Sequence, residues 1–253
     1  MGALDGKIAI ITGAGGGLGK ATTLVFAKEG ATLALADLPG EGLASAAREA
    51  PALGARTISV PCDVCDRAQV NAVVQKTIEA FGGVDILVQY AQAIKPDSPL
   101  EVASEQDFVD TWRSGVMGSV FFMQACFPHM RDRGGGKIVN VGSSGGVLGT
   151  RGVGPYATAK EGIRGLTKVA ANEWGKHNIT VNCLCPSGMT PTFEQYWRDH
   201  PGAYEAAVKR IPMGRLGDPE RDIARGVLAL VGPDLGFLTG ASIMLDGGTV
   251  LIS

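Results

Sequence analysis

The feature that most constrains the fold of this 253-residue chain is a glycine-rich turn directly after a short apolar run. Residues 7–12 are rich in β-branched side chains and predict a buried strand, and the turn runs from Gly13 to Gly19. An amphipathic helix pattern follows over 18–29 and stops at Gly30. Glycines let a backbone approach phosphates closely, and the free N–H groups of a helix N-terminus face an anion. The turn therefore predicts a cradle for the pyrophosphate of a dinucleotide.

Strand and helix patterns alternate along the whole chain. Predicted strands cover 7–12, 32–36, 56–60, 84–89, 136–141, 179–185 and 241–245, and predicted helices cover 18–29, 41–49, 66–81, 104–131, 156–176 and 219–231. This rhythm is typical of an α/β fold with a doubly wound parallel sheet of about seven strands and helices on both faces, the Rossmann fold. No repeat or shift in composition marks a boundary, so we predict one domain over 1–253.

Asp37 ends the second predicted strand, eighteen residues past Gly19. A carboxylate at this point accepts hydrogen bonds from ribose hydroxyls and repels a 2′-phosphate, so it favours NAD over NADP. No Arg or Lys lies within the glycine turn or directly after Asp37, which favours the same cofactor. The alternative for Asp37, and equally for Asp63, is a helix N-cap.

Tyr156 and Lys160 are four residues apart and lie on one face of a predicted helix. Because a nearby ammonium favours the phenolate, we expect the pKa of Tyr156 to lie below its ordinary value of about 10. Ser143 is thirteen residues upstream and is suited to hold a carbonyl or alcohol oxygen, with Ser144 as the competing assignment. These residues predict an acid/base device that interconverts an alcohol and a ketone while the dinucleotide carries the hydride.

These motifs make the chain resemble the short-chain dehydrogenase/reductase family over nearly its whole length. Residues 12–19 match the family's TGxxxGxG turn, residues 62–64 match its adenine contact, and 238–248 match its closing strand. The resemblance implies catalysis by Ser143, Tyr156 and Lys160, and a homotetrameric assembly. It implies cofactor contacts from Gly13, Gly17, Leu18, Gly19, Asp37, Asp63, Val64, Ala91, Tyr156, Lys160 and Pro186.

The chain departs from this family's pattern at two places. Gln89-Tyr90-Ala91-Gln92 replaces the family's Asn-Asn-Ala-Gly, so a glycine that allows close backbone approach is absent. Gly115 aligns with a catalytic asparagine that orders a water in the family's proton relay, and a glycine within a helix predicts a local bend. Since the tyrosine, lysine and serine are kept, we still expect activity.

Residues 186–218 are rich in Pro, Gly, Met and aromatic residues and show no regular pattern. They follow the sixth predicted strand, where substrate should lie, so we predict an irregular lid. An apolar wall around a hydrophobic, cyclic or aromatic substrate would come from Ile94, Val147, Leu148, Met189, Phe193 and Trp197, with Ser143 on the substrate oxygen. The alternative is that these apolar side chains are simple core.

The composition argues against other classes of function. A net charge of −2 gives no electrostatic case for nucleic acid or an anionic membrane, and no apolar run approaches the roughly 20 residues of a transmembrane helix. The pairs Cys62/Cys65 and Cys183/Cys185 end strands in different parts of the predicted sheet, so we expect no metal site. The chain begins directly with its first strand, without a leader, and we expect a cytoplasmic protein.

Together these patterns predict a short-chain, NAD-dependent alcohol dehydrogenase or carbonyl reductase acting on a small molecule. Two alternatives stay open at this point. One is an NADPH-preferring reductase. The other is a non-catalytic or weakly active NAD-binding regulator or scaffold, for which Gln92 and Gly115 are the supporting residues.

Overall fold

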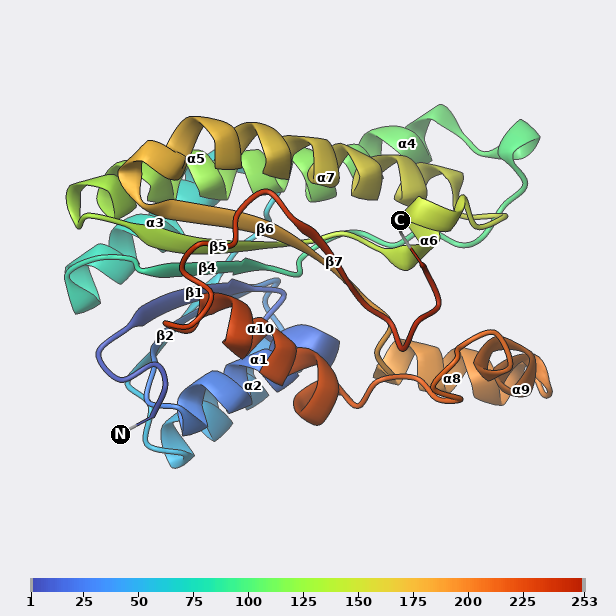
Figure 1. The fold of residues 1–253 in the computed structure, drawn as a ribbon, viewed down its shortest axis with the longest axis horizontal. Helices are drawn as coiled ribbons and strands as arrows, with labels where there is room; N and C mark the ends of the chain where they lie inside the picture. Colours follow the sequence, from blue (N-terminus) through green and yellow to red (C-terminus); the bar gives the residue numbers. More distant parts are fainter. Residues whose placement is uncertain (1, 252–253) are drawn as a thin grey trace.

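A computed structural model describes residues 2–251, and its centre is one parallel sheet covered on both faces by helices (Figure 1). In spatial order the strands are β3 (Thr57–Pro61), β2 (Thr32–Asp37), β1 (Ile8–Thr12), β4 (Ile86–Gln89), β5 (Gly136–Val141), β6 (Ile179–Pro186) and β7 (Ser242–Leu245). The predicted doubly wound sheet is confirmed, and each predicted strand ends within two residues of an observed one.

The middle strands are buried because both faces of the sheet are covered, which explains their continuous apolar runs. All five residues of β1 are buried, and Ile10 pairs in register with Ala34 of β2 and Leu87 of β4. The strand order runs outward from β1 in one direction and from β4 in the other. This reversal opens a crevice at the carboxyl ends of β1 and β4, where ligands of such sheets bind.

Each face of the sheet has its own layer of helices (Figure 1). One layer contains α1 (Gly17–Lys28), α2 (Glu41–Ala52) and α10 (Arg225–Val231), which continues from the π-helical turn η4 (Pro219–Ala224). The other contains α3 (Arg67–Phe81), α5 (Gly118–Asp132) and α7 (Gly154–Trp174). The layers bury separate apolar clusters against the sheet, one around Phe26 and the other around Phe122 and Met130. These clusters hold the strand ends in place.

The segment predicted as one helix over 104–131 is interrupted at the glycine that suggested a bend. It forms α4 (Glu105–Trp112), a π-helical turn η2 (Arg113–Met117) that contains Gly115, and then α5. The short elements η1 (Leu100–Val102) and α6 (Ser144–Leu148) were not predicted, and the predicted helix over 156–176 ends in the 3₁₀ turn η3 (Gly175–His177). A π-helical turn within a helix is frequent at functional sites.

The segment 186–218 is not irregular, and this prediction was wrong. It contains α8 (Pro191–Asp199) and α9 (Ala203–Val208), which lie at one end of the molecule, beyond the carboxyl ends of the strands (Figure 1). Thr190 caps α8 by accepting a hydrogen bond from the Phe193 amide at 3.3 Å. The ends of this α8–α9 excursion (residues 189–216) are held together, because Met189 N–H donates to the Gly217 carbonyl and Gly217 N–H to the Ser187 carbonyl, both at 2.9 Å.

Candidate active site

The glycine turn after β1 has the tight geometry that its sequence predicts. Gly13 and Gly17 have φ values of +67° and +47°, which side chains other than glycine rarely adopt. A Cβ atom at Gly19 would collide with the carbonyl oxygen of Gly13, and one at Gly13 would lie 3.0 Å from the Ala91 amide nitrogen. The turn is therefore closed on itself and against the loop after β4.

Helix α1 begins at this turn with its N-terminus open to an anion. Its N-cap is Gly16, which makes no side-chain capping bond, and the first turn has no acidic residue. A Cβ atom at Gly16 would meet nothing within 4 Å, so there is free space above the turn. Unpaired N–H groups, a helix dipole and free space are what a pyrophosphate requires, and the residues present fit a dinucleotide.

Asp37 lies beside the turn at the end of β2. Its Oδ2 accepts a hydrogen bond from the Gly15 amide and its Oδ1 from the Leu38 amide, both at 2.8 Å. The N-cap of α2 is Gly40, so the alternative that Asp37 caps this helix is wrong. The carboxylate is held at the edge where the ribose of a bound dinucleotide would lie.

Asp63 and Val64 follow β3 at the same edge of the sheet. Asp63 Oδ1 accepts from the Cys65 amide at 2.9 Å, whereas the N-cap of α3 is Asp66, so Asp63 is not the cap either. Val64 is buried against α5, where a Cβ atom at Gly118 would lie 3.1 Å from it. Pro186 ends β6, so the predicted cofactor residues other than Tyr156 and Lys160 of α7 lie at or just beyond the carboxyl end of a strand.

Tyr156 and Lys160 lie one turn apart in α7, next to Ser143 at the carboxyl end of β5. The Lys160 Nζ is 5.4 Å from the centroid of the Tyr156 ring and donates a hydrogen bond to the Val141 carbonyl at 2.8 Å. Lys160 is only 4% exposed, and burial lowers its pKa to about 8. The three residues that the sequence selected are therefore brought together. The Lys160 ammonium loses its proton at a lower pH than that of an ordinary lysine.

The expected lowering of the Tyr156 pKa is wrong for this structure. Burial raises the pKa of Tyr156, and hydrogen bonding with the Ser143 hydroxyl only partly opposes that effect. Sequence spacing places a cation one turn from the phenol, but it does not show that the ammonium is directed to a backbone carbonyl. Desolvation of the phenolate therefore outweighs the effect of the Ser143 hydrogen bond.

The structure separates the two serines that compete for the substrate oxygen. Ser144 is buried and its hydroxyl donates to Asp246 Oδ2 at 3.0 Å, on the side of the C-terminal segment. Ser143 is the N-cap of α6 and its Oγ accepts from the Gly145 amide at 3.1 Å. The Ser143 hydroxyl also hydrogen-bonds with Tyr156, so Ser143 is the serine that faces the phenol.

The unusual sequence after β4 is accommodated by new contacts. Gln89 Nε2 donates to Asn140 Oδ1 at 2.8 Å inside the sheet layer, and the Tyr90 hydroxyl bonds the Thr22 hydroxyl of α1 at 2.8 Å. The Ala91 amide donates to Thr12 Oγ1 at 3.2 Å. The loop is therefore held against the glycine turn and α1 by these contacts.

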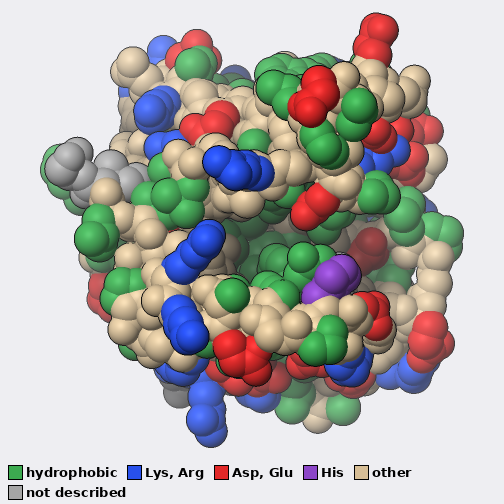
Figure 2. Space-filling model, turned by 90° about the vertical axis from the view of Figure 1, so that its right-hand side faces the viewer, with side chains coloured by type: hydrophobic (Ala, Val, Ile, Leu, Met, Phe, Trp, Pro, Cys, Tyr) green, Lys and Arg blue, Asp and Glu red, His purple; other side chains and the backbone are tan. Residues whose placement is uncertain are grey.

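A hollow opens at this end of the molecule, with hydrophobic side chains gathered inside it and charged ones around its rim (Figure 2). Of the predicted apolar wall, Ile94 is 70%, Leu148 55% and Phe193 46% exposed, so these side chains are not core. Met189 instead lines a cavity of about 450 Å³ between α1, α8 and η4, together with Gly17. Its place is on the cofactor-turn side of the excursion, a position that the sequence did not indicate.

The aromatic residues of α8 and α9 pack on one another. The ring centroids of Phe193 and Trp197 are 5.9 Å apart, those of Tyr196 and His200 4.3 Å, and those of Trp197 and Tyr204 6.0 Å. All of these rings are exposed or half-buried, so they pack on one another at the surface and not in a core.

The remaining candidate groups stay apart. Cys62 follows β3 at one edge of the sheet, whereas Cys183 and Cys185 lie in β6, as predicted, and all are free. Over residues 2–251, no three His, Cys, Asp or Glu side chains are grouped to hold a metal ion. In the same range, no helix has both the length and the apolar character needed to span a bilayer.

Comparison with known proteins agrees with this geometry. A family model described as "Enoyl-(Acyl carrier protein) reductase" matches residues 13–250. The chain is 39% identical to a 12alpha-hydroxysteroid dehydrogenase of a Clostridium species over 98% of each chain. It is 38% identical to a 3-oxoacyl-(acyl-carrier-protein) reductase of Thermotoga maritima over 98% of this chain and 99% of that one. The solved structure of L-sorbose reductase from Gluconobacter frateurii, complexed with NADPH and L-sorbose, superposes with a TM-score of 0.92 at 30% identity, over 100% of both chains.

Proposed function

The chain belongs to the short-chain dehydrogenase/reductase family, and on that premise we propose that it is an NAD(H)-dependent enzyme interconverting a secondary alcohol and a ketone. The observation that carries the proposal is the meeting of Ser143, Tyr156 and Lys160 at the sheet edge that also holds the glycine turn. A bound dinucleotide supplies a hydride donor or acceptor at this edge. The chain's own residues supply the proton and hold the reacting oxygen.

Ser143 and Tyr156 are suited to hydrogen-bond the same substrate oxygen. In the direction of reduction Tyr156 donates its phenolic proton to the oxygen, and in the direction of oxidation it accepts that proton as a general base. A raised pKa keeps Tyr156 protonated at neutral pH, which favours its role as the acid. Lys160, with its pKa lowered to about 8, remains mostly cationic at pH 7 and stabilises negative charge that develops on the phenol oxygen.

Asp37 supports NAD as the preferred cofactor. Two backbone amides hold its carboxylate beside Gly15, where it would face the ribose, and a 2′-phosphate there would meet a like charge. The family also includes users of the phosphorylated cofactor, since L-sorbose reductase is complexed with NADPH. The carboxylate of Asp37 is therefore the group that distinguishes NAD from NADP in this site.

The substrate we propose is hydrophobic and cyclic or aromatic. Exposed apolar side chains such as Ile94, Leu148 and Phe193, together with the apolar hollow at this end of the molecule (Figure 2), support a pocket that selects by shape and area. The Clostridium relative is named for a hydroxysteroid, which is a ring alcohol.

We also propose a homotetramer. Apolar side chains are exposed on the outer layer of helices, with Val109 and Trp112 of α4 at 48% and 42% and Val169 of α7 at 55%. Analytical ultracentrifugation of the purified protein tests the assembly, and a monomer would contradict it.

Absorbance at 340 nm tests the reaction directly. The protein is supplied with NAD⁺ or NADP⁺ and a panel of secondary alcohols, from cyclohexanol to terpenols and 12α-hydroxysteroids. We expect reduction of NAD⁺ with at least one ring alcohol and a lower rate with NADP⁺. Binding of NAD⁺ without turnover of any alcohol or ketone would favour the non-catalytic alternative.

A further inference from the structure

Both polar atoms of the Gln92 side chain, Nε2 and Oε1, are buried and have no hydrogen-bond partner among residues 2–251. Buried amides in folded proteins are almost always paired, because an unpaired donor or acceptor loses its hydration without compensation. An unpaired carboxamide is therefore a sign of a partner that enters the site. No part of the mechanism above uses this side chain.

The amide of Gln92 occupies space that only a glycine at position 115 leaves free. A Cβ atom built on Gly115 would lie 2.9 Å from Cδ of Gln92 and 3.0 Å from both Nε2 and Oε1. The nearly equal distances mean that the amide lies flat over Gly115. The two residues that depart from the family's pattern are thus one feature, in which a side chain at position 92 fills the place left by position 115.

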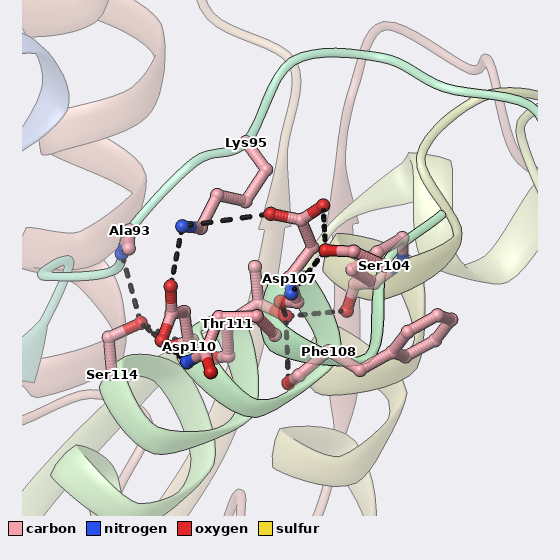
Figure 3. Close-up of polar contacts among 10 residues, drawn as sticks. Ala93, Lys95, Ser104, Asp107, Phe108, Asp110, Thr111 and Ser114 are labelled. Carbon is pink, nitrogen blue, oxygen red and sulfur yellow. Dashed lines mark hydrogen bonds and ion pairs between the residues drawn. The ribbon is translucent and has the colours of Figure 1, made fainter. Parts of the chain in front are cut away.

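The backbone on both sides of Gln92 is firmly held, so the amide has a defined position. On one side the Ala91 amide donates to Thr12 Oγ1. On the other, the Ala93 amide donates to Ser114 Oγ at 3.1 Å, and Lys95 Nζ forms an ion pair with Asp110 at 2.6 Å (Figure 3). Asp107, one turn earlier in α4, forms a second ion pair with Lys95 at 3.7 Å (Figure 3).

The amide lies between the cofactor turn and the catalytic helix. The preceding residue, Ala91, abuts Gly13 of the turn. Gly115, beneath the amide, is followed by Val116, which packs with Ala159 and Ile163 of α7 on either side of Lys160. A partner bound by the amide would therefore lie where the dinucleotide and the acid/base residues meet.

We propose that Gln92 is a positioning residue, whose carboxamide hydrogen-bonds a hydroxyl group or water at this junction when the cofactor is bound. Oε1 accepts from the hydroxyl and Nε2 donates to it, which pairs both unpaired atoms with a group that donates and accepts. A ribose hydroxyl of the cofactor and an ordered water share this chemistry. The inference rests on the proposed function, and Gly115 is the glycine that gives the amide its space.

Gln92→Met tests the proposal because it keeps the length of the side chain and removes both polar atoms. We expect kcat/KM to fall at least tenfold, while Tm stays unchanged or rises because an unpaired buried amide has been removed. Gln75→Met, on the exposed face of α3, is the matched control and should change neither quantity. A changed Tm with unaltered kcat, KM, cofactor affinity and pH profile would overturn the proposal.

Titration of NADH fluorescence separates the two sources of the hydroxyl. Weaker NADH binding, by a factor close to the loss in kcat/KM, indicates a hydroxyl of the cofactor. Unchanged NADH binding with a shifted pH profile of kcat indicates a water. Because NADH binding and Tm can be measured without any turnover, this arm remains informative even if the wild-type protein oxidises no alcohol.

Gly115→Ala gives a second, independent test. Its Cβ atom should displace the amide and lower kcat/KM by about the same factor as Gln92→Met. The double variant Gln92→Met/Gly115→Ala should then lose no more than the worse single variant, because both changes act through one amide. Losses that multiply would show that Gly115 and Gln92 act separately, and would overturn the pairing.

Discussion

Helices α7 and α8 lie on either side of β6 in the chain, and they are built in opposite ways. α7 has 21 residues, packs against β6 and α4, and buries Lys160 and Ala159 beneath the site. α8 has nine residues, and its described side chains are exposed or half-buried. The difference teaches that the groups we propose to move protons are fixed by the core, whereas the groups we propose to meet the variable part of a substrate are carried on a separate excursion.

The strongest test of this contrast is the removal of one hydroxyl from α7. Tyr156→Phe should lower kcat by about 10³-fold, since general acid/base catalysis contributes 10²–10⁴-fold, with little change in NADH affinity. The matched control is Tyr204→Phe in α9, which should change kcat less than threefold. Kinetics at 340 nm compare the variants. Retention of a tenth of the wild-type kcat by Tyr156→Phe would remove the basis of the proposed chemistry.

Burial of Lys160 makes a prediction about stability. Its folded pKa of about 8 lies below the ordinary value of 10.5, so the unfolded chain binds more protons between these values and stability from this group rises with pH. Relative to Lys160→Met, the wild-type free energy of unfolding should gain about 2 kcal/mol between pH 7 and 9.5.

Urea unfolding at the two pH values measures this gain. Lys168→Met is the matched control, because Lys168 is exposed on the same helix and should show no such difference. An equal pH dependence in the wild type and in Lys160→Met would mean that the ammonium is not desolvated as the structure has it.

At the cofactor end of the packed region, Asp37 should set the preference for NAD⁺ over NADP⁺. Asp37→Ala removes the acceptor for ribose hydroxyls and the charge that opposes a 2′-phosphate, so the ratio of kcat/KM for NAD⁺ over NADP⁺ should fall about tenfold. Asp63→Ala, beyond β3, should alter the ratio much less. An unchanged preference in Asp37→Ala would assign cofactor selection to another residue.

The smallest expected effect lies in the excursion. Phe193→Ala should raise KM for the largest apolar substrate by about three- to fivefold, because it removes part of an apolar wall, and should leave kcat and NADH affinity close to wild type. Comparison of a small ring alcohol with a large one measures this selectivity. A large loss of kcat with both substrates would break the division between the two regions.

The sequence was sufficient for most of the scaffold because its signals are local. β-branched runs identified the strands. The turn was identified by Gly13 and Gly17, whose positive φ values favour glycine, and by Gly19, where a side chain would collide with the Gly13 carbonyl. The N-cap at Thr190 followed by Pro191 was a readable start signal for α8, but the surrounding glycines and prolines obscured it.

Features that depend on burial, or on contact between segments far apart in the chain, could not be predicted from the sequence. Spacing alone put a cation near Tyr156, yet the direction of its pKa shift follows from desolvation, which only the packed structure reveals. Gln92 and Gly115 were two separate departures in the sequence, and only their contact shows that they form a pair. The division between Ser143 and Ser144 likewise required the position of Asp246, about a hundred residues later.

The two backbone hydrogen bonds that join residues 187, 189 and 217 have a practical consequence for engineering. The chain leaves the sheet and returns to it at neighbouring points. A replacement segment of another length would therefore span the same short distance. A library that varies only residues 191–208, and keeps the buried Ile211 and the Met213 amide that donates to the Gly247 carbonyl, would therefore test whether this segment selects the substrate.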